Sequence, residues 1–230
     1  MELMAMTRKL LDETSPGWVK GLAEADLTVW QTDRVPLPFR RVSAGAFWMG
    51  SRGENPSEEP RHRVRITRPF FMATFPVTQH QYRAVIGRKR KDGLDPSPSH
   101  FKGDLRPVET VSWGDVIRWC ELLQGMKALR TAEASLGEGP LRAGLPTEAQ
   151  WEYACRAGTD TEYYTGDGEA ALDEAGWYAK NSKSETHSVG LKAPNDYRLY
   201  DMHGNVEELC ADAWDEHAYK KRVVGVCDPM

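Results

Sequence analysis

The amino-acid sequence predicts a loop-rich domain that mixes short strands with short helices. At 230 residues, the chain is long enough to bury a sizeable core of its own. Eight Trp and eight Tyr occur together with 20 Gly and 14 Pro. Large rings supply buried area, and Gly and Pro mark turns. The composition therefore indicates a core of aromatic side chains that holds irregular segments in place.

Residues 1–34 predict a separate helical extension. Apolar side chains such as Leu3, Leu10 and Leu22 recur there at helical spacing, and Ser15-Pro-Gly17 interrupts the pattern. Val35-Pro-Leu-Pro38 restricts the backbone to extended conformations. We therefore place a boundary at this point, with the main domain over residues 35–230.

The main domain begins with predicted strands. Phe39–Val42 and Ala46–Met49 read as the two strands of a hairpin that turns through Ser43-Ala-Gly45. His62–Ile66 alternates polar and apolar residues, as a half-buried strand does, and the apolar run Pro69–Met72 extends that wall.

Capping residues mark three predicted helices. Thr78 precedes a helix over residues 79–86, and Ser112 precedes one over residues 113–123. Thr147 and Gln150 form a capping box at the start of a third helix. By contrast, Lys127–Leu141 is rich in Ala and Glu and contains two Gly, so we expect a solvated excursion there.

Charge and hydropathy argue against several classes of protein. The formal net charge of -4 gives no attraction to nucleic acids, and the basic run Arg88–Lys91 is typical of an exposed loop. No apolar window approaches the ~20 residues of a membrane span. The first 20 residues contain acidic side chains and lack a continuous apolar stretch, so we expect a cytoplasmic protein without a secretory signal.

The four cysteines predict buried thiols for the most part. Cys120, Cys155, Cys210 and Cys227 are too few for a disulfide framework and include no CxxC pair that would indicate a zinc ribbon. The six histidines form no helical pair of the kind that binds zinc.

Two carboxylates are candidates for chemistry. Glu152 has no His or second carboxylate beside it in sequence, which favours structural hydrogen bonding over acid–base catalysis. In Gly204-Asn-Val-Glu-Glu208, the Asn205 amide and the Glu208 carboxylate, three residues apart, suit an oxygen-only site for Ca²⁺. Spacing alone favours a simpler alternative, a helix N-terminus capped by Asn205.

A longer set of motifs resembles the formylglycine-generating enzyme / sulfatase-modifying factor family. The matching segments run in family order: Phe47-Trp-Met-Gly-Ser51, Glu59-Pro-Arg-His-Arg-Val64, Phe75-Pro-Val-Thr78, Pro107-Val-Glu-Thr-Val-Ser-Trp113, Leu145-Pro-Thr-Glu-Ala-Gln-Trp-Glu-Tyr153 and Leu199-Tyr-Asp-Met-His-Gly-Asn-Val206. The resemblance implies a single α+β domain of the C-type-lectin-like kind, with short strands, few helices and much ordered loop. It also implies a structural Ca²⁺ held by Asn205, Val206 and Glu208.

The sequence departs from the family pattern after this turn. Glu207-Glu-Leu209 replaces the usual Trp-Glu-Trp, and the family segment that carries two copper-binding cysteines is missing, so we expect a C-terminally truncated member. Cys227 alone remains as a weak catalytic candidate. One thiolate does not make the two-cysteine Cu(I) site that the resemblance implies for oxidising members, so copper is not expected.

These observations predict a non-oxidising, calcium-stabilised domain that binds a ligand or a protein as an accessory module. One alternative is a formylglycine-generating oxidase whose missing segment comes from a partner. Another is a truncated, inactive gene product. The expected partner is a protein or peptide, or a second copy that completes the C-terminal core.

Overall fold

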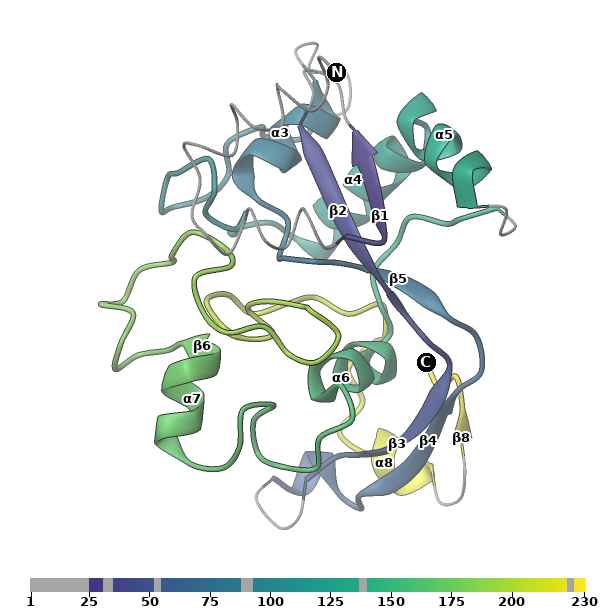
Figure 1. Ribbon diagram of the computed structural model, residues 1–230, viewed down its shortest axis with the longest axis vertical. Coiled ribbons are helices and arrows are strands. Elements are labelled where there is room, and N and C mark those ends of the chain that lie inside the picture. The colour runs from purple at the N-terminus through teal and green to yellow at the C-terminus, as the bar shows by residue number, and fades with distance from the viewer. Residues whose placement is uncertain (1–24, 31–34, 52–54, 88–92, 137–139, 223–225) are drawn as a thin grey trace.

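The computed structural model describes residues 25–30, 35–51, 55–87, 93–136, 140–222 and 226–230 (Figure 1). The strands are β1 (Leu27–Trp30), β2 (Pro36–Val42), β3 (Gly45–Met49), β4 (His62–Ile66), β5 (Phe70–Ala73), β6 (Gly176–Trp177), β7 (His203–Gly204) and β8 (Val226–Cys227). The helices are the 3-10 turn η2 (Pro56–Glu58), α3 (Gln79–Ile86), α4 (Trp113–Gln124), α5 (Lys127–Leu136), α6 (Glu148–Arg156), α7 (Glu169–Ala175) and α8 (Ala218–Lys221). Short strands, few helices and long ordered loops confirm the predicted α+β fold.

Most of the predicted N-terminal extension lies outside the described residues. Its described end is the strand β1, which pairs antiparallel with β2. Across the described ranges, no helix combines the length and the apolar character needed to cross a bilayer.

The predicted hairpin between Phe39 and Met49 is wrong. The two segments follow one another along one extended stretch as β2 and β3, and Ser43–Ala44 between them makes no reversal. β2 pairs antiparallel with β5, and β3 pairs antiparallel with β4, so the hairpin is longer and closes farther along the chain. Figure 1 shows this bent ribbon crossing the molecule and joining its two ends.

The first core cluster lies at the end of the molecule that holds α3, α4 and α5. Tyr82 and Trp119 stack with ring centroids 6.2 Å apart, and the Trp119 indole donates to the Tyr82 carbonyl. α5 contradicts the prediction of a solvated excursion, because Leu129 and Ala132 are buried against this cluster. The helix forms because it has an apolar face to bury, although most of its other positions are polar.

The second core cluster lies between α6 and the sheet β3-β4-β8. Ala149 and Ala154 of α6 are fully buried, and such small side chains let a helix approach a sheet closely. Gly45 of β3 faces Tyr153 of α6, where an added Cβ would overlap the phenol oxygen. β8 pairs parallel with β4 and completes this sheet.

Two glycines bring distant segments together at the strands β6 and β7. Gly176 lies opposite His203, and Trp177 lies opposite Gly204. A Cβ added at Gly176 would overlap the His203 carbonyl, and one added at Gly204 would overlap the Trp177 carbonyl. The backbones therefore meet at a distance that only glycine allows.

Gly176→Ala tests this close approach. We expect a loss of about 1–3 kcal/mol in the free energy of unfolding, because the added methyl group forces β6 and β7 apart. Urea denaturation measures the change. Gly144→Ala is the matched control, since Gly144 has an ordinary φ and no atom within 4 Å of the added Cβ. An equal effect of both variants would contradict the packing described.

Candidate functional site

The helix α6 begins at a capping box and presents polar side chains to several segments of the chain. The Thr147 hydroxyl accepts from the Gln150 amide (3.2 Å), and the Gln150 side chain accepts from the Thr147 amide (3.0 Å). This start, predicted from the sequence, fixes which residues of α6 face the sheet and which face the loops.

Glu152 links α6 to the end of β3. Its Oε1 accepts from the Gly50 amide (3.0 Å) and from Arg156 Nε (2.8 Å). Arg156 in turn donates to the Gly50 carbonyl (3.2 Å), so the chain after β3 is held at both backbone groups. These contacts match the structural role that the sequence favoured for Glu152.

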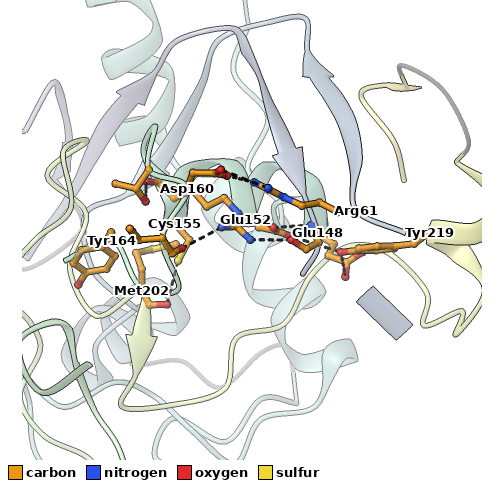
Figure 2. A network of polar contacts seen from close by, with 12 residues as sticks. Arg61, Glu148, Glu152, Cys155, Asp160, Tyr164, Met202 and Tyr219 are labelled. Atoms are coloured by element: carbon orange, nitrogen blue, oxygen red, sulfur yellow. Dashed lines mark hydrogen bonds and ion pairs between the residues drawn. The ribbon is translucent and has the colours of Figure 1, made fainter. Parts of the chain in front are cut away.

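A second set of contacts joins the start of α6 to α8 (Figure 2). The Tyr219 hydroxyl donates to Glu148 Oε1 (3.2 Å), and Arg222 Nη1 lies 3.8 Å from Glu148 Oε2. Asp212 Oδ2 accepts from the Glu148 amide (2.7 Å). Burial raises the pKa of Glu148, although the Tyr219 hydroxyl and the Arg222 guanidinium favour the ionised form. Together, these contacts fix residues 212–222 to α6.

The turn predicted to bind Ca²⁺, Gly204–Glu208, begins with two residues of left-handed backbone, Gly204 (φ 79°) and Asn205 (φ 65°). The Asn205 amide oxygen accepts from the His187 amide (2.8 Å), and its Nδ2 donates to the His187 carbonyl (3.1 Å). Residues 205–210 form no helix. The alternative of a helix capped by Asn205 is therefore wrong.

Two carboxylates lie in this turn. Glu208 Oε2 accepts from the Trp151 indole (2.6 Å), and burial raises the Glu208 pKa to about 7, with a further contribution from the Asp201 charge. Asp201 is 1% exposed and accepts from the Gly190 amide (2.6 Å). Burial raises the Asp201 pKa to about 6. In the described part of the chain, no Lys or Arg forms an ion pair with either carboxylate.

This donor set is compatible with a hard cation. Glu208, the carbonyl of Val206 and the carboxylate of Asp201 lie within a short segment of the sequence, the charge of Asp201 acts on Glu208, and oxygen is the ligand that Ca²⁺ prefers. The side-chain oxygen of Asn205 accepts a hydrogen bond from the His187 amide, so Asn205 also stabilises the turn directly. Among the described residues, no group of three or more His, Cys, Asp or Glu could hold an ion, so any site here needs backbone oxygens.

Asp201 was missed at the sequence level. It lies three residues before Gly204, inside the motif Leu199-Tyr-Asp-Met-His-Gly-Asn-Val206. Its position next to Asn205 depends on the left-handed backbone of the turn, where Asn205 Nδ2 donates to Asp201 Oδ1 (3.3 Å). The sequence signal that could have identified Asp201 is an acidic residue between the apolar residues Tyr200 and Met202.

The thiol of Cys155 lies beside an imidazole but is not activated. Its sulfur is 3.7 Å from His203 Nε2 and donates to the Met202 carbonyl (3.6 Å). Burial raises the pKa of Cys155 and lowers the pKa of His203 to about 4. Both groups are therefore neutral at pH 7, whereas a reactive cysteine needs the thiolate.

The other three cysteines lie elsewhere. Burial raises the pKa of Cys120 in α4 to about 11 and the pKa of Cys210 to about 12. Cys227 of β8 is exposed and lies opposite Arg65. On β4, Val64 and Ile66 pack toward α6, whereas Arg65 between them is exposed on the other face. Cys227 pairs with Arg65 and is also exposed, so it lies on the sheet face away from Cys155. The four thiols are free and form no disulfide.

The sequence can now be compared with known proteins. A family model described as "Sulfatase-modifying factor enzyme 1-like domain" matches residues 36–227. The chain belongs to this family. The match covers the strands β2 to β8, α6 and the turn at Gly204–Glu208, and it confirms the resemblance found in the sequence.

Relatives of the chain carry different names. It is 29% identical over 188 residues to "Chaperone protein LppX" of Paenibacillus barcinonensis, covering 65% of this chain and 63% of that protein. It is 39% identical over 151 residues to a formylglycine-generating enzyme of Thermomonospora curvata, covering 59% of this chain and 43% of the enzyme. The matched part of the chain thus spans less than two thirds of the length of each of these two relatives.

Solved structures support the fold. Treponema denticola variable protein 1 superposes with a TM-score of 0.63 at 27% identity, over 80% of this chain and 75% of that one. PvdO from Pseudomonas aeruginosa superposes with a TM-score of 0.62 at 24% identity, over 92% and 80% of the two chains.

Alkylation rates test the description of the thiols. We expect iodoacetamide to modify Cys227 of the native protein at least about tenfold faster than Cys155, because Cys227 is exposed, whereas Cys155 is buried and burial raises its pKa. Peptide mass spectrometry identifies the modified residue. Cys227→Ser should remove the fast phase, and unfolding in urea should expose the other three thiols. Fast modification of native Cys155 would contradict its burial.

Proposed function

We propose that this chain is a non-oxidising member of the family, a calcium-stabilised domain that binds a protein or peptide. The placement of the thiols carries the proposal. The resemblance implies that oxidising members use a pair of cysteines on Cu(I), and a soft metal of this kind needs thiolates that can meet. Here Cys155 lies in the core between α6 and the sheet, Cys120 belongs to the other core cluster, Cys227 is exposed on β8, and Cys210 is partly exposed. All four are free thiols.

Names among the relatives support a binding role. One relative is named a chaperone, and a mouse relative, 23% identical over 238 residues, is named an inactive formylglycine-generating enzyme. One of these names describes a different role, and the other states that the enzyme is inactive. Active formylglycine-generating enzymes align as well, so a direct assay must separate the two functions.

Calcium is proposed from the chemistry of the turn. Asp201 and Glu208 are acidic groups whose pKa values burial raises, so ionising them in the metal-free protein costs free energy. A divalent cation would offset this cost. Bound Ca²⁺ would supply charge compensation and a fixed geometry for the turn, while Asn205 and Trp151 position the protein groups around it.

An aldehyde assay tests the absence of oxidase activity. Purified protein is incubated with Cu(I), O₂ and a Cys-x-Pro-x-Arg peptide, and hydrazide trapping followed by mass spectrometry detects aldehyde. We expect none above the level of a peptide incubated without protein. The Thermomonospora curvata formylglycine-generating enzyme on the same peptide is the positive control. Catalytic formation of aldehyde by this chain would disprove the proposal.

Glu208→Gln tests the calcium site, because glutamine keeps an acceptor for the Trp151 indole but removes the charge. In wild-type protein, Ca²⁺ at about 100 times its dissociation constant should add about 2.7 kcal/mol to the free energy of unfolding. We expect Glu208→Gln to lose this response. Glu207→Gln, at the exposed neighbouring carboxylate, should keep it. Thermal unfolding with Ca²⁺ or with chelator measures the difference.

The same variants give a pH signature in chelator. The Glu208 pKa is about 7 in the folded protein and near 4.5 when the chain is unfolded. The folded state therefore binds more protons between these values. This contribution is fully present below pH 4.5 and is lost as the pH rises through about 7. Wild type and Glu207→Gln should share this loss of stability, and Glu208→Gln should keep only the part that comes from Asp201, whose pKa is about 6. A calcium response retained by Glu208→Gln would remove the site from the proposal.

A further inference from the structure

The outward face of the sheet β3-β4-β8 carries a row of arginines. Along β4, His62, Val64 and Ile66 point into the core, while Arg63 and Arg65 are exposed between them. This face is opposite to the one that packs on α6. It is also separate from the turn proposed to bind Ca²⁺.

Trp48 of β3 lies in the middle of this row. It is directly across from Arg63 in the β3–β4 register and is 47% exposed. The guanidinium carbons of Arg61 and Arg63 lie 5.9 and 5.7 Å from its ring centroid. An aromatic ring at this distance attracts a guanidinium by about 0.5–1 kcal/mol at exposed sites and restricts its orientation. We call Trp48, Arg61, Arg63 and Arg65 the arginine face.

The charges of this face are poorly compensated. Elsewhere in the described structure, six arginines form ion pairs with acidic side chains: Arg40, Arg83, Arg106, Arg118, Arg156 and Arg222. On the arginine face, Arg61 pairs with Asp160, as Figure 2 shows. Within the described residues, no acidic side chain forms an ion pair with Arg63 or Arg65. A chain with a net charge of -4 thus leaves two exposed guanidinium groups available, and Trp48 orients one of them, that of Arg63.

We propose that the arginine face binds an extended acidic segment of a partner protein. Alternate residues of a strand are about 6.7 Å apart, and the alternate side chains of an extended peptide have the same spacing. Carboxylates two positions apart in such a peptide would therefore meet Arg63 and Arg65 in register. The planar fork of arginine suits carboxylates, and the Trp48 ring pre-orients that of Arg63.

The same chemistry fits a single-stranded nucleic acid less well. Nucleic-acid bases need an open aromatic surface on which to stack. Trp48 already holds two guanidinium groups close to its ring, so the ring is not open for stacking. An acidic peptide requires only the guanidinium forks.

This inference rests on the proposed binding role and gives that role a surface and a class of partner. The test measures fluorescence anisotropy of a labelled twelve-residue peptide of alternating Glu and Thr with the full chain at low salt. We expect Arg63→Glu/Arg65→Glu to weaken binding at least about tenfold, since it replaces attraction by repulsion. Trp48→Ala should weaken it about threefold. Lys127→Glu/Arg130→Glu makes the same change of charge at exposed positions of α5 and should alter binding less than about twofold.

The outcomes separate this inference from its alternatives. A peptide with the same composition, arranged as a block of Glu followed by a block of Thr, should bind more weakly than the alternating peptide. Equal loss in both charge-reversal pairs, equal binding of both peptides, or no binding of the alternating peptide would overturn the inference. Tighter binding of a single-stranded oligonucleotide would also overturn it. Arg63→Gln/Arg65→Gln with native circular dichroism guards against a folding defect. None of these results depends on the aldehyde assay, which tests the proposed function separately.

Discussion

The contact between α6 and the sheet β3-β4-β8 is the constraint on which the rest of this structure depends. Small residues on one side of the helix, Ala149 and Ala154, let it lie close to β3, opposite Gly45. The other side then projects Glu148, Trp151 and Glu152 toward segments from distant parts of the chain. Gly50, Glu208 and Tyr219 each bond to one of these three side chains. A shift of α6 would therefore disturb β3, the calcium-type turn and α8 together.

Trp151 and Glu208 connect this packing to function. The indole donates to a carboxylate whose pKa is raised by burial, and Asp201 adds a second negative charge nearby. A buried carboxylate that lacks a cationic partner is costly, which is the reason for proposing that the turn responds to pH and to a bound cation. The arginine face has the opposite character, since its charges are exposed, positive and oriented by Trp48.

The sequence was most informative where the chemistry is local. The capping residues Thr78, Ser112 and Thr147 predicted three helix starts correctly, because a cap involves neighbours within one turn of the chain. It was least informative where partners are distant. The strands β2 and β3 read as a hairpin since their pairing with β5 and β4 leaves no local signal. α5 read as solvated because its segment is rich in Ala and Glu and contains two Gly, whereas Leu129 and Ala132 become buried only against other elements.

The site shows the same division. The motif around Gly204 singled out a segment whose backbone is left-handed at Gly204 and Asn205, and its binding of Ca²⁺ stays a prediction. The roles of individual atoms did not follow, because the bonds of Asn205 to His187 and of Asp201 to Gly190 join different loops. The neutral state of Cys155 beside His203 likewise depends on burial that no local pattern encodes.

The strand β8 has a consequence for biosynthesis. It pairs with β4, and Asp228 accepts a bond from the Thr67 amide across 161 positions of sequence. Contacts between such remote residues slow folding, since a long loop must close before they form. On the ribosome, the sheet can therefore acquire its third strand only after nearly the whole described chain has emerged. Until then, one edge of β4 is open to pairing with other nascent chains, and chaperone protection during translation would matter most at this edge.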